Sequence, residues 1–345
     1  MVSFKSLCLV SALAAVTATG AVAETIKING AGATFPFPLY SKWFSDYTKV
    51  DKDAQINYQS IGSGGGIKQF TEGVVDFGAS DTPMTDEQMA KLKIPALHIP
   101  TALGAVVVTY NLKEVADLKL TSATLADIFL GKITTWNDKA IAEANPKAKL
   151  PSTKIIVAHR SDGSGTSGIF TDYLAKVSKE WKDKVGAGTA VNWPAGLGGK
   201  GNEGVTGLVK GTPGSLGYVE LIYAEKNKLS HASIKNKSGN FVSASMTAVT
   251  EAAAGSLKNM PADFRVSITD AEGKGAYPIA GFTYLLVSQT MGKVKGEKIV
   301  KFLKWALTDG QKTNESLQYS KLPDELAKKV LAKVDTIKLS EASGH

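Results

Sequence analysis

The stretch Asp162-Gly163-Ser164-Gly165-Thr166-Ser167-Gly168 joins a predicted strand, Lys154–Ala158, to a predicted helix, Thr166–Val177. Two similar turns occur earlier, Gly30-Ala31-Gly32-Ala33-Thr34-Phe35 and Gly62-Ser63-Gly64-Gly65-Gly66. Glycine allows a tight turn with N–H groups pointing into a concavity, Ser and Thr add hydroxyl donors, and a helix start presents unpaired N–H groups. Ordinary helix capping explains one such turn. Three of them, each at the carboxyl end of a strand, predict an anion site at the edge where α/β sheets bind ligands.

Short apolar strands alternate with amphipathic helices along the chain, which is typical of an α/β fold. The predicted strands are Thr25–Asn29, Gln55–Ile61, Val74–Ala79, Ala105–Tyr110, Lys154–Ala158, Ser215–Val219 and Phe282–Val287. The predicted helices are Phe37–Tyr47, Gly66–Thr71, Thr85–Leu92, Thr124–Leu130, Thr166–Val177, Val205–Val209, Met246–Ala254, Gly296–Leu307 and Pro323–Val334. We expect Trp43, Trp136, Trp181 and Trp305 to pack in the core.

The first 23 residues have the features of a signal peptide. Lys5 precedes an apolar stretch, Leu7–Val16, and Ala21-Val22-Ala23 supplies the small residues of a cleavage site after Ala23. The apolar stretch is shorter than the about 20 residues of a membrane-spanning helix, which disfavours the alternative of an N-terminal anchor. Cleavage removes Cys8, the only cysteine. We therefore expect a periplasmic protein without disulfides or cysteine-ligated metals.

The length and charge of the chain limit its organisation and partners. A chain of 345 residues exceeds what a single core usually fills, which predicts two domains. Removal of Lys5 with the signal peptide leaves 39 of the 40 basic residues, which exceed the 32 acidic ones by 7. The lysines are scattered singly, so we expect no nucleic-acid binding and a solvated surface that mildly attracts anions.

A dinucleotide site is an alternative, because Gly163-Ser164-Gly165-Thr166-Ser167-Gly168 satisfies the pattern G-x-G-x-x-G. That pattern needs an acidic residue at the end of the next strand to hold a ribose. The next predicted strand, Thr189–Asn192, ends in asparagine. A second match, Gly199-Lys200-Gly201-Asn202-Glu203-Gly204, follows Trp193-Pro194 without a predicted strand. Both observations disfavour an oxidoreductase.

Catalytic motifs are missing from the sequence. It contains no G-x-S-x-G elbow, no G-x-x-x-x-G-K-[ST] loop and no H-E-x-x-H zinc motif. The four histidines, His98, His159, His231 and His345, are too scattered to indicate a metal site. A secreted phosphatase would need a nucleophile with a base, or a metal cluster. We therefore predict no enzyme, no catalytic residue, no metal and no cofactor.

Several segments share order and spacing with one known family. They are Gly30-Ala31-Gly32-Ala33-Thr34-Phe35-Pro36, Gly62-Ser63, Val75-Asp76-Phe77-Gly78-Ala79-Ser80-Asp81, Arg160 to Ser167, Trp193-Pro194, Gly196 to Asn202 and Gly217-Tyr218-Val219-Glu220. Over nearly the whole mature chain, the sequence resembles the phosphate-binding protein of the bacterial phosphate-specific ABC transporter. The resemblance implies capture of inorganic phosphate and delivery to the permease subunits in the inner membrane, by a protein that we expect to be a monomer.

The resemblance also implies a fold. It is the type II periplasmic binding fold, in which two α/β lobes are joined by crossing hinge strands and close on the ligand. We expect lobe I to comprise residues 24–107 and 280–345, and lobe II residues 108–279. The crossings are expected near Ala105–Asn111 and Tyr277–Val287.

Carried over by resemblance, the ligand set consists of Thr34, the backbone N–H of Phe35, Ser63, Asp81, Arg160, Ser164, Gly165 and Thr166, with Asp162 orienting Arg160. Asp81 is the unusual member, because a carboxylate repels a bound anion unless the ligand carries a proton that it can accept. Hydrogen phosphate carries such a proton and sulfate does not. Two alternatives remain, namely that Asp81 caps the helix that follows it, and that the receptor serves another tetrahedral oxyanion such as sulfate or molybdate.

Overall fold

A computed structural model describes residues 25–341. The predicted signal peptide and Cys8 lie outside the described residues. The strands are β1 (Ile26–Gly32), β2 (Ala54–Ser60), β3 (Phe77–Ser80), β4 (Ala96–Tyr110), β5 (Lys119–Leu120), β6 (Ile156–Arg160), β7 (Leu197–Gly199), β8 (Ser215–Glu220), β9 (Ser230–His231), β10 (Ser233–Lys235), β11 (Phe241–Val242), β12 (Ala280–Ser288), β13 (Thr290–Gly292) and β14 (Lys338–Ser340).

The α-helices are α1 (Phe37–Tyr47), α2 (Ser63–Thr71), α3 (Asp86–Met89), α4 (Ser122–Phe129), α5 (Lys139–Ala144), α6 (Gly165–Val177), α7 (Lys179–Lys184), α8 (Gly201–Gly211), α9 (Leu221–Lys226), α10 (Met246–Ala254), α11 (Lys293–Ala306) and α12 (Asp324–Val334). Three short 3-10 segments, η1 (Leu257–Asn259), η2 (Asp309–Thr313) and η3 (Glu315–Leu317), complete the elements of the described residues. The helices α1 and α10 have the bounds predicted from the sequence.

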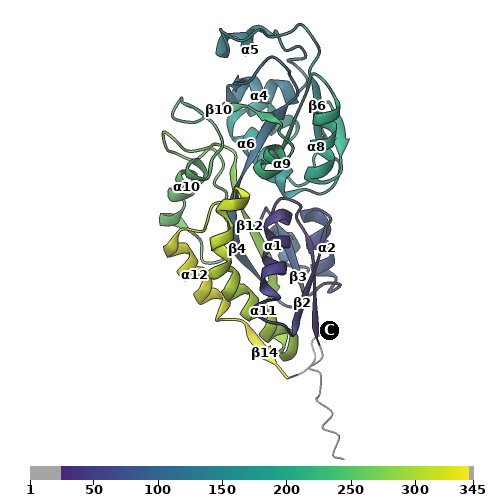
Figure 1. Ribbon diagram of the computed structural model, residues 1–345, viewed down its shortest axis with the longest axis vertical. Coiled ribbons are helices and arrows are strands. Elements are labelled where there is room, and N and C mark those ends of the chain that lie inside the picture. The colour runs from purple at the N-terminus through teal and green to yellow at the C-terminus, as the bar shows by residue number, and fades with distance from the viewer. Residues whose placement is uncertain (1–24, 342–345) are drawn as a thin grey trace, which may run out of the picture.

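One long sheet runs through the molecule in the order β2-β1-β3-β12-β4-β8-β6-β7, and β9 pairs with β4. The outer pairs are parallel, β1 with β2 and β3 at one end and β6 with β7 and β8 at the other. The central pairs of β12 with β3 and β4, and of β4 with β8, are antiparallel. Figure 1 shows two bodies built on these two ends, one with α1, α2 and α11, the other with α4, α6, α8 and α9. They correspond to lobe I and lobe II.

The strands β4 and β12 join the two lobes, as the resemblance implied. From residue 96 to 105, β4 pairs with β12, and from Val106 onward it pairs with β8. Every residue of β4 and eight of the nine residues of β12 are buried, as expected for strands covered on both faces. The mixed α/β architecture with crossing strands confirms the predicted fold class. The residue bounds given above for the lobes stay a prediction.

The strand β4 begins nine residues earlier than predicted, because polar side chains interrupt its apolar pattern. His98 and Thr101 are both buried, and each has a specific partner. The His98 ring accepts a hydrogen bond from the Met84 N–H (3.0 Å), and the Thr101 hydroxyl donates to the Thr283 carbonyl (3.1 Å). Hydrogen bonds to residues elsewhere in the fold therefore allow buried polar residues in this strand, whereas the alternation of apolar and polar residues alone predicts a loop there.

The helices bury apolar faces against the sheet. In α1, Leu39, Tyr40, Trp43, Phe44 and Tyr47 recur at helical spacing and are all buried. Trp43, Trp136 and Trp181 are fully buried and Trp305 is partly buried against the core, which confirms their predicted packing role. The crossing strands are covered by α10, which packs on β4 and β12.

Candidate anion site between the lobes

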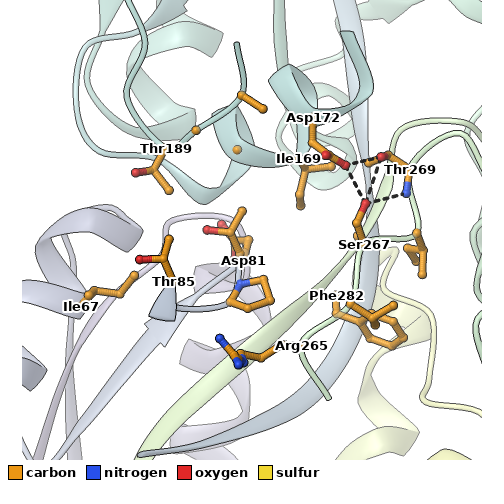
Figure 2. A pocket seen from close by; sticks show the side chains of 18 of the residues that line it. Ile67, Asp81, Thr85, Ile169, Asp172, Thr189, Arg265, Ser267, Thr269 and Phe282 are labelled. Atoms are coloured by element: carbon orange, nitrogen blue, oxygen red, sulfur yellow. Dashed lines mark hydrogen bonds between the residues drawn. The ribbon is translucent and has the colours of Figure 1, made fainter. Parts of the chain in front are cut away.

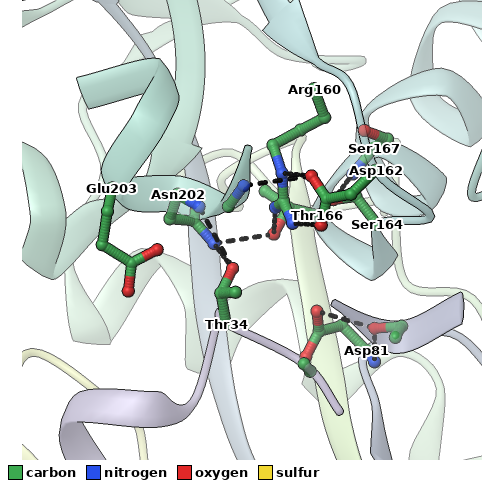
Figure 3. Close-up of polar contacts among 12 residues, drawn as sticks. Thr34, Asp81, Arg160, Asp162, Ser164, Thr166, Ser167, Asn202 and Glu203 are labelled. Atoms are coloured by element: carbon green, nitrogen blue, oxygen red, sulfur yellow. Dashed lines mark hydrogen bonds and ion pairs between the residues drawn. The ribbon is translucent and has the colours of Figure 1, made fainter. Parts of the chain in front are cut away.

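The three glycine-rich turns meet at one place between the lobes. Thr34 follows β1 and Asp81 follows β3, both in lobe I, and the helix α2 starts at Ser63. Facing them across the boundary are Arg160 at the end of β6 and the start of α6 at Gly165. Figure 3 shows Thr34 and Asp81 pointing toward Arg160, Ser164 and Thr166. The structure therefore brings the predicted ligand residues together from both lobes.

The two lobes touch directly at this site. The Gly64 N–H donates to the Gly163 carbonyl (2.9 Å), so the turn before α2 contacts the turn before α6. A methyl group at Gly165 would lie 2.6 Å from Asp81 Oδ2 and closer still to Ser63 Oγ. Only glycine at position 165 allows lobe I to approach the N-terminus of α6 this closely.

Arg160 is held by a carboxylate of its own lobe. Its Nε and Nη2 donate to the two carboxylate oxygens of Asp162 at 2.8 and 2.5 Å, and its side chain is buried. Burial alone would raise the pKa of Asp162, but the hydrogen bonds and charge of Arg160 outweigh it and hold that pKa below its usual value. The third guanidinium nitrogen of Arg160, Nη1, lies 3.4 Å from the Thr166 hydroxyl oxygen and thus next to the anion site. The geometry agrees with the predicted role of Asp162 in orienting the guanidinium.

The N-terminus of α6 supplies unpaired donors. The Ser164 hydroxyl accepts a hydrogen bond from the Ser167 N–H (3.0 Å), so this side chain caps the helix while its own proton stays available. The N–H groups of Gly165 and Thr166 lie in the first helical turn, which has no intrahelical acceptor for them. Together with the Phe35 N–H near the start of α1, they provide main-chain donors of the kind that bind anions.

Asp81 is almost completely buried, at 3% exposure. Its carboxylate accepts hydrogen bonds from the hydroxyls of Thr283 (2.8 Å) and Ser63 (3.4 Å). Burial raises the pKa of Asp81 to about 7, and the hydrogen bonds and the Arg160 charge oppose this rise. The carboxyl can therefore exchange a proton near neutral pH. The alternative role as a helix cap is wrong, because α3 is capped by Thr85.

A cavity of about 550 Å³ adjoins the site on one side. Asp81 forms part of its wall together with Ile169, Asp172, Arg265 and Phe282 (Figure 2). On the far side of this cavity, Asp172 accepts hydrogen bonds from the hydroxyls of Ser267 and Thr269. The space between the lobes therefore extends from Asp81 along the crossing strands.

Sequence reasoning missed four polar residues at the site, Asn202, Glu220, Tyr223 and Thr283. The Asn202 amide nitrogen donates to the hydroxyls of Thr34 (2.7 Å) and Thr166 (3.1 Å), which come from different lobes. The Tyr223 hydroxyl donates to the Thr34 carbonyl (2.5 Å). A signal for Asn202 was present in the segment Gly199 to Gly204, whereas the sequence contains no local signal for Thr283 on β12.

Glu220 lies buried beneath the site at the end of β8. The Tyr319 hydroxyl donates to the Phe35 carbonyl (2.6 Å) and lies 3.2 Å from Glu220 Oε2, while Oε1 has no hydrogen-bond partner in the described part of the chain. Burial raises the pKa of Glu220 well above its usual value. The raised pKa favours the neutral form of this carboxyl and so reduces the negative charge behind the anion site.

The predicted strand Thr189–Asn192 is wrong, because the strand after α6 is β7, three residues after Trp193-Pro194. The second G-x-G-x-x-G match therefore does follow a strand and opens α8. Its glycines serve packing: a methyl group at Gly199 would lie 2.6 Å from the Gly204 backbone, and the Gly201 N–H donates to Asp162 (3.0 Å). For the first match, the next strand is β7, and no acidic residue ends it. For the second match, the next strand, β8, ends in Glu220, but that carboxyl is fully buried and caps α9 by accepting from the Ile222 N–H (3.0 Å), so it is not free to hold a ribose.

Two further findings concern the described part of the chain as a whole. In residues 25–341, no helix is long and apolar enough to cross a membrane. Within the same range, no three His, Cys, Asp or Glu side chains gather closely enough to hold a metal ion. His159 is stacked on Trp193, with ring centroids 5.0 Å apart.

Comparisons with known proteins define the class and then the family. A model of the PBP superfamily domain matches residues 15–310. A phosphate-binding protein PstS from Xylella fastidiosa strain Temecula1 is 46% identical over 312 residues, which cover 90% of this chain and 85% of the relative. Another phosphate-binding protein PstS, from Methanocaldococcus jannaschii, is 44% identical over 339 residues, covering 91% and 87%. The protein is a member of the PBP superfamily, and within it the chain belongs to the PstS family of phosphate-binding proteins.

Solved structures agree on the fold. A high-affinity periplasmic phosphate-binding protein bound with phosphate has a TM-score of 0.72 at 20% identity, and the match covers 92% of this chain and 97% of that protein. A phosphate ABC transporter substrate-binding protein from Clostridium perfringens, also with bound phosphate, has a TM-score of 0.64 at 19% identity and covers 86% and 100%. At these identities, the likeness supports the two-lobed fold alone.

Proposed function

We propose that this protein binds inorganic phosphate between its lobes and delivers it to the permease of an ABC transporter. The observation that carries the proposal is the composition of the buried site. Neutral donors and the Arg160 guanidinium, which Asp162 holds, face the carboxylate of Asp81 across the lobe boundary. Hydrogen phosphate offers mostly acceptors and one proton, and it therefore complements this arrangement. Membership in the PstS family supports the same ligand.

The proposed ligand groups divide between the lobes. Lobe I contributes Thr34, Phe35, Ser63 and Asp81, and lobe II contributes Arg160, Ser164, Gly165 and Thr166, with Asp162 orienting Arg160. A ligand that contacts both sets favours the closed form by its extra affinity for that form. The closed form then provides a shape that a permease can distinguish from the empty receptor.

Asp81 sets the proposed selectivity among tetrahedral oxyanions. Sulfate has no proton to give, so an ionised Asp81 would face it as a second, unpaired negative charge. Protonation of Asp81, whose pKa is raised to about 7, would remove that penalty. A receptor for sulfate or molybdate is the competing function, and it would require Asp81 to remain protonated at neutral pH.

The proposal includes the setting of the protein. It acts as a monomer in the periplasm after cleavage behind Ala23, and it performs no catalysis. The absence of a G-x-S-x-G elbow and of an H-E-x-x-H motif in the full sequence supports a binding role over that of a phosphatase.

Isothermal titration calorimetry tests this function on the mature protein, dialysed until free of phosphate. We expect one phosphate per chain to bind tightly and sulfate to give no heat at about pH 8, where an ionised Asp81 rejects it. Heat from sulfate alone, or from neither anion, would overturn the assignment. Robust turnover of a chromogenic phosphate ester would contradict the proposal that the protein is not an enzyme.

A further inference from the structure

Asn202 lies at the centre of the polar network between the lobes, in the first turn of α8, and is completely buried. Its Oδ1 accepts a hydrogen bond from the Glu220 N–H (2.9 Å). Because a backbone N–H is always a donor, this bond identifies the amide oxygen, and the other amide atom must be the NH₂ group. The orientation of the Asn202 side chain is therefore fixed by the backbone of β8.

The NH₂ group donates its two protons to two hydroxyls of the anion site. One is Thr34 Oγ1 at 2.7 Å and the other is Thr166 Oγ1 at 3.1 Å. Thr34 Oγ1 also receives the backbone N–H of Asn202 (3.2 Å), and Thr166 Oγ1 is approached by Arg160 Nη1 (3.4 Å). A hydroxyl oxygen has two lone pairs, so each of these two oxygens has its accepting capacity filled.

We propose that Asn202 is a positioning residue that makes the Thr34 and Thr166 hydroxyls donors only. With their lone pairs filled, each hydroxyl can direct its proton at an anion, and neither can accept a proton from the ligand. The inference rests on the proposed function, and it adds to that function a reason why the site binds an oxyanion rather than a neutral polar solute.

The arrangement also depends on contact between the lobes. Thr34 belongs to lobe I, whereas Thr166 and Asn202 belong to lobe II. Separation of the lobes would remove both Asn202 donors from Thr34, and its hydroxyl could then rotate to accept from water. The donor set is therefore completed only when the lobes meet.

Two substitutions separate this role from a merely structural one. Asn202→Asp keeps the size of the side chain and an acceptor for the Glu220 N–H, but its second oxygen accepts from both hydroxyls and turns their protons away from the ligand. Asn202→Ala removes the Glu220 partner and leaves a small cavity, but the hydroxyls stay free to point at the anion. A structural role alone predicts that Asp is tolerated better than Ala.

We expect the opposite order in calorimetry with inorganic phosphate. Asn202→Ala should weaken binding by about tenfold, and Asn202→Asp by at least about 100-fold, since each reversed hydroxyl removes a charge-assisted hydrogen bond worth about tenfold. If the wild-type protein binds phosphate and Asn202→Asp binds it as tightly as Asn202→Ala does, this inference is overturned and the proposed function stands. Wild type that binds no phosphate would overturn the proposed function as well.

A double-mutant cycle with Thr34→Val excludes a pure effect of the new negative charge. If Asn202 acts through the Thr34 hydroxyl, Asn202→Asp should cost about tenfold less in the Thr34→Val background. Additive losses would mean that the carboxylate acts only through its field and would contradict the proposal. The cycle is repeated with Asn202→Ala, so that the result does not depend on the folding of one variant, and thermal unfolding without phosphate checks each protein.

Discussion

Replacing Asp81 by asparagine should stabilise the phosphate-free protein at high pH and leave its stability at low pH almost unchanged. The reason is the cost of burying a carboxylate, which raises the pKa of Asp81 from its usual 3.8 to about 7. A carboxyl whose pKa is raised by folding stabilises the folded state below its unfolded pKa, and this contribution is lost as pH rises through the folded pKa. The relevant window therefore extends from about pH 4 to pH 7.

The magnitude follows from the same shift. Each pH unit between the unfolded and folded pKa corresponds to about 1.4 kcal/mol, so full ionisation of Asp81 costs about 4 kcal/mol at most. This figure is an upper bound, because opening of the lobes hydrates the carboxylate in the ligand-free protein. The amide in Asp81→Asn removes the cost at every pH and retains an acceptor for the Thr283 hydroxyl.

Urea denaturation of phosphate-free wild type and Asp81→Asn at about pH 4 and about pH 9 measures the effect. The free energy of unfolding of the variant, relative to wild type, should be higher at the alkaline pH by up to about 4 kcal/mol. The exposed Asp117→Asn serves as the matched control and should show no such difference. An equal difference between variant and wild type at both pH values would refute the buried-carboxylate reasoning.

Three further predictions concern ligand binding and are checked by calorimetry. Arg160→Lys should bind phosphate at least about tenfold more weakly, because the planar fork is lost; unchanged affinity would put the guanidinium outside the site. In the wild-type protein, sulfate affinity should rise by up to about tenfold for each unit that pH falls, because sulfate needs Asp81 protonated. In Asp81→Asn, sulfate affinity should be independent of pH and selectivity for phosphate over sulfate should fall. A wild-type sulfate affinity that does not change with pH would contradict the selective role of the Asp81 proton. Gly165→Ala should lower phosphate affinity by at least about 100-fold, because the added methyl group would collide with Ser63 and Asp81. The control Gly207→Ala adds a methyl group in open space and should bind phosphate like the wild-type protein. Equal phosphate affinities of the two variants would argue against close contact of the lobes at α6.

The local parts of the site were predictable from the sequence because glycine-rich turns are local features. A strand, a Gly-Ser or Gly-Thr turn and a helix follow one another within a few residues, and this order alone predicts an exposed helix N-terminus. The starts of α2 and α6 agree with that reasoning. The individual ligand residues were predicted from the family resemblance, since the spacing of the turns in the sequence does not show which of their residues meet in the folded protein.

The missed residues have in common that their roles exist only in the tertiary structure. Thr283 reaches Asp81 from a strand 202 residues away in the sequence, and an isolated threonine in an apolar strand indicates nothing about its partner. Asn202 was hidden by the wrong placement of the strand before it, at Thr189–Asn192 instead of β7. The beginning of β4 was missed for the same reason, since the partners of His98 and Thr101 are distant in sequence.

The hydrogen bonds across the site indicate why closure should depend on the anion. With the lobes in contact, Asn202 donates to Thr34 and Thr166, while those two hydroxyls, the first N–H groups of α6 and Nη1 of Arg160 lie together at the buried boundary between the lobes. Donors left without acceptors in a buried space cost free energy, and donors of like polarity also repel one another. An anion removes both costs at once, whereas in an open form water can serve each lobe separately. The free energy that favours the closed form is therefore supplied mainly by the ligand's acceptors, and a ligand with fewer acceptors would close the protein less completely.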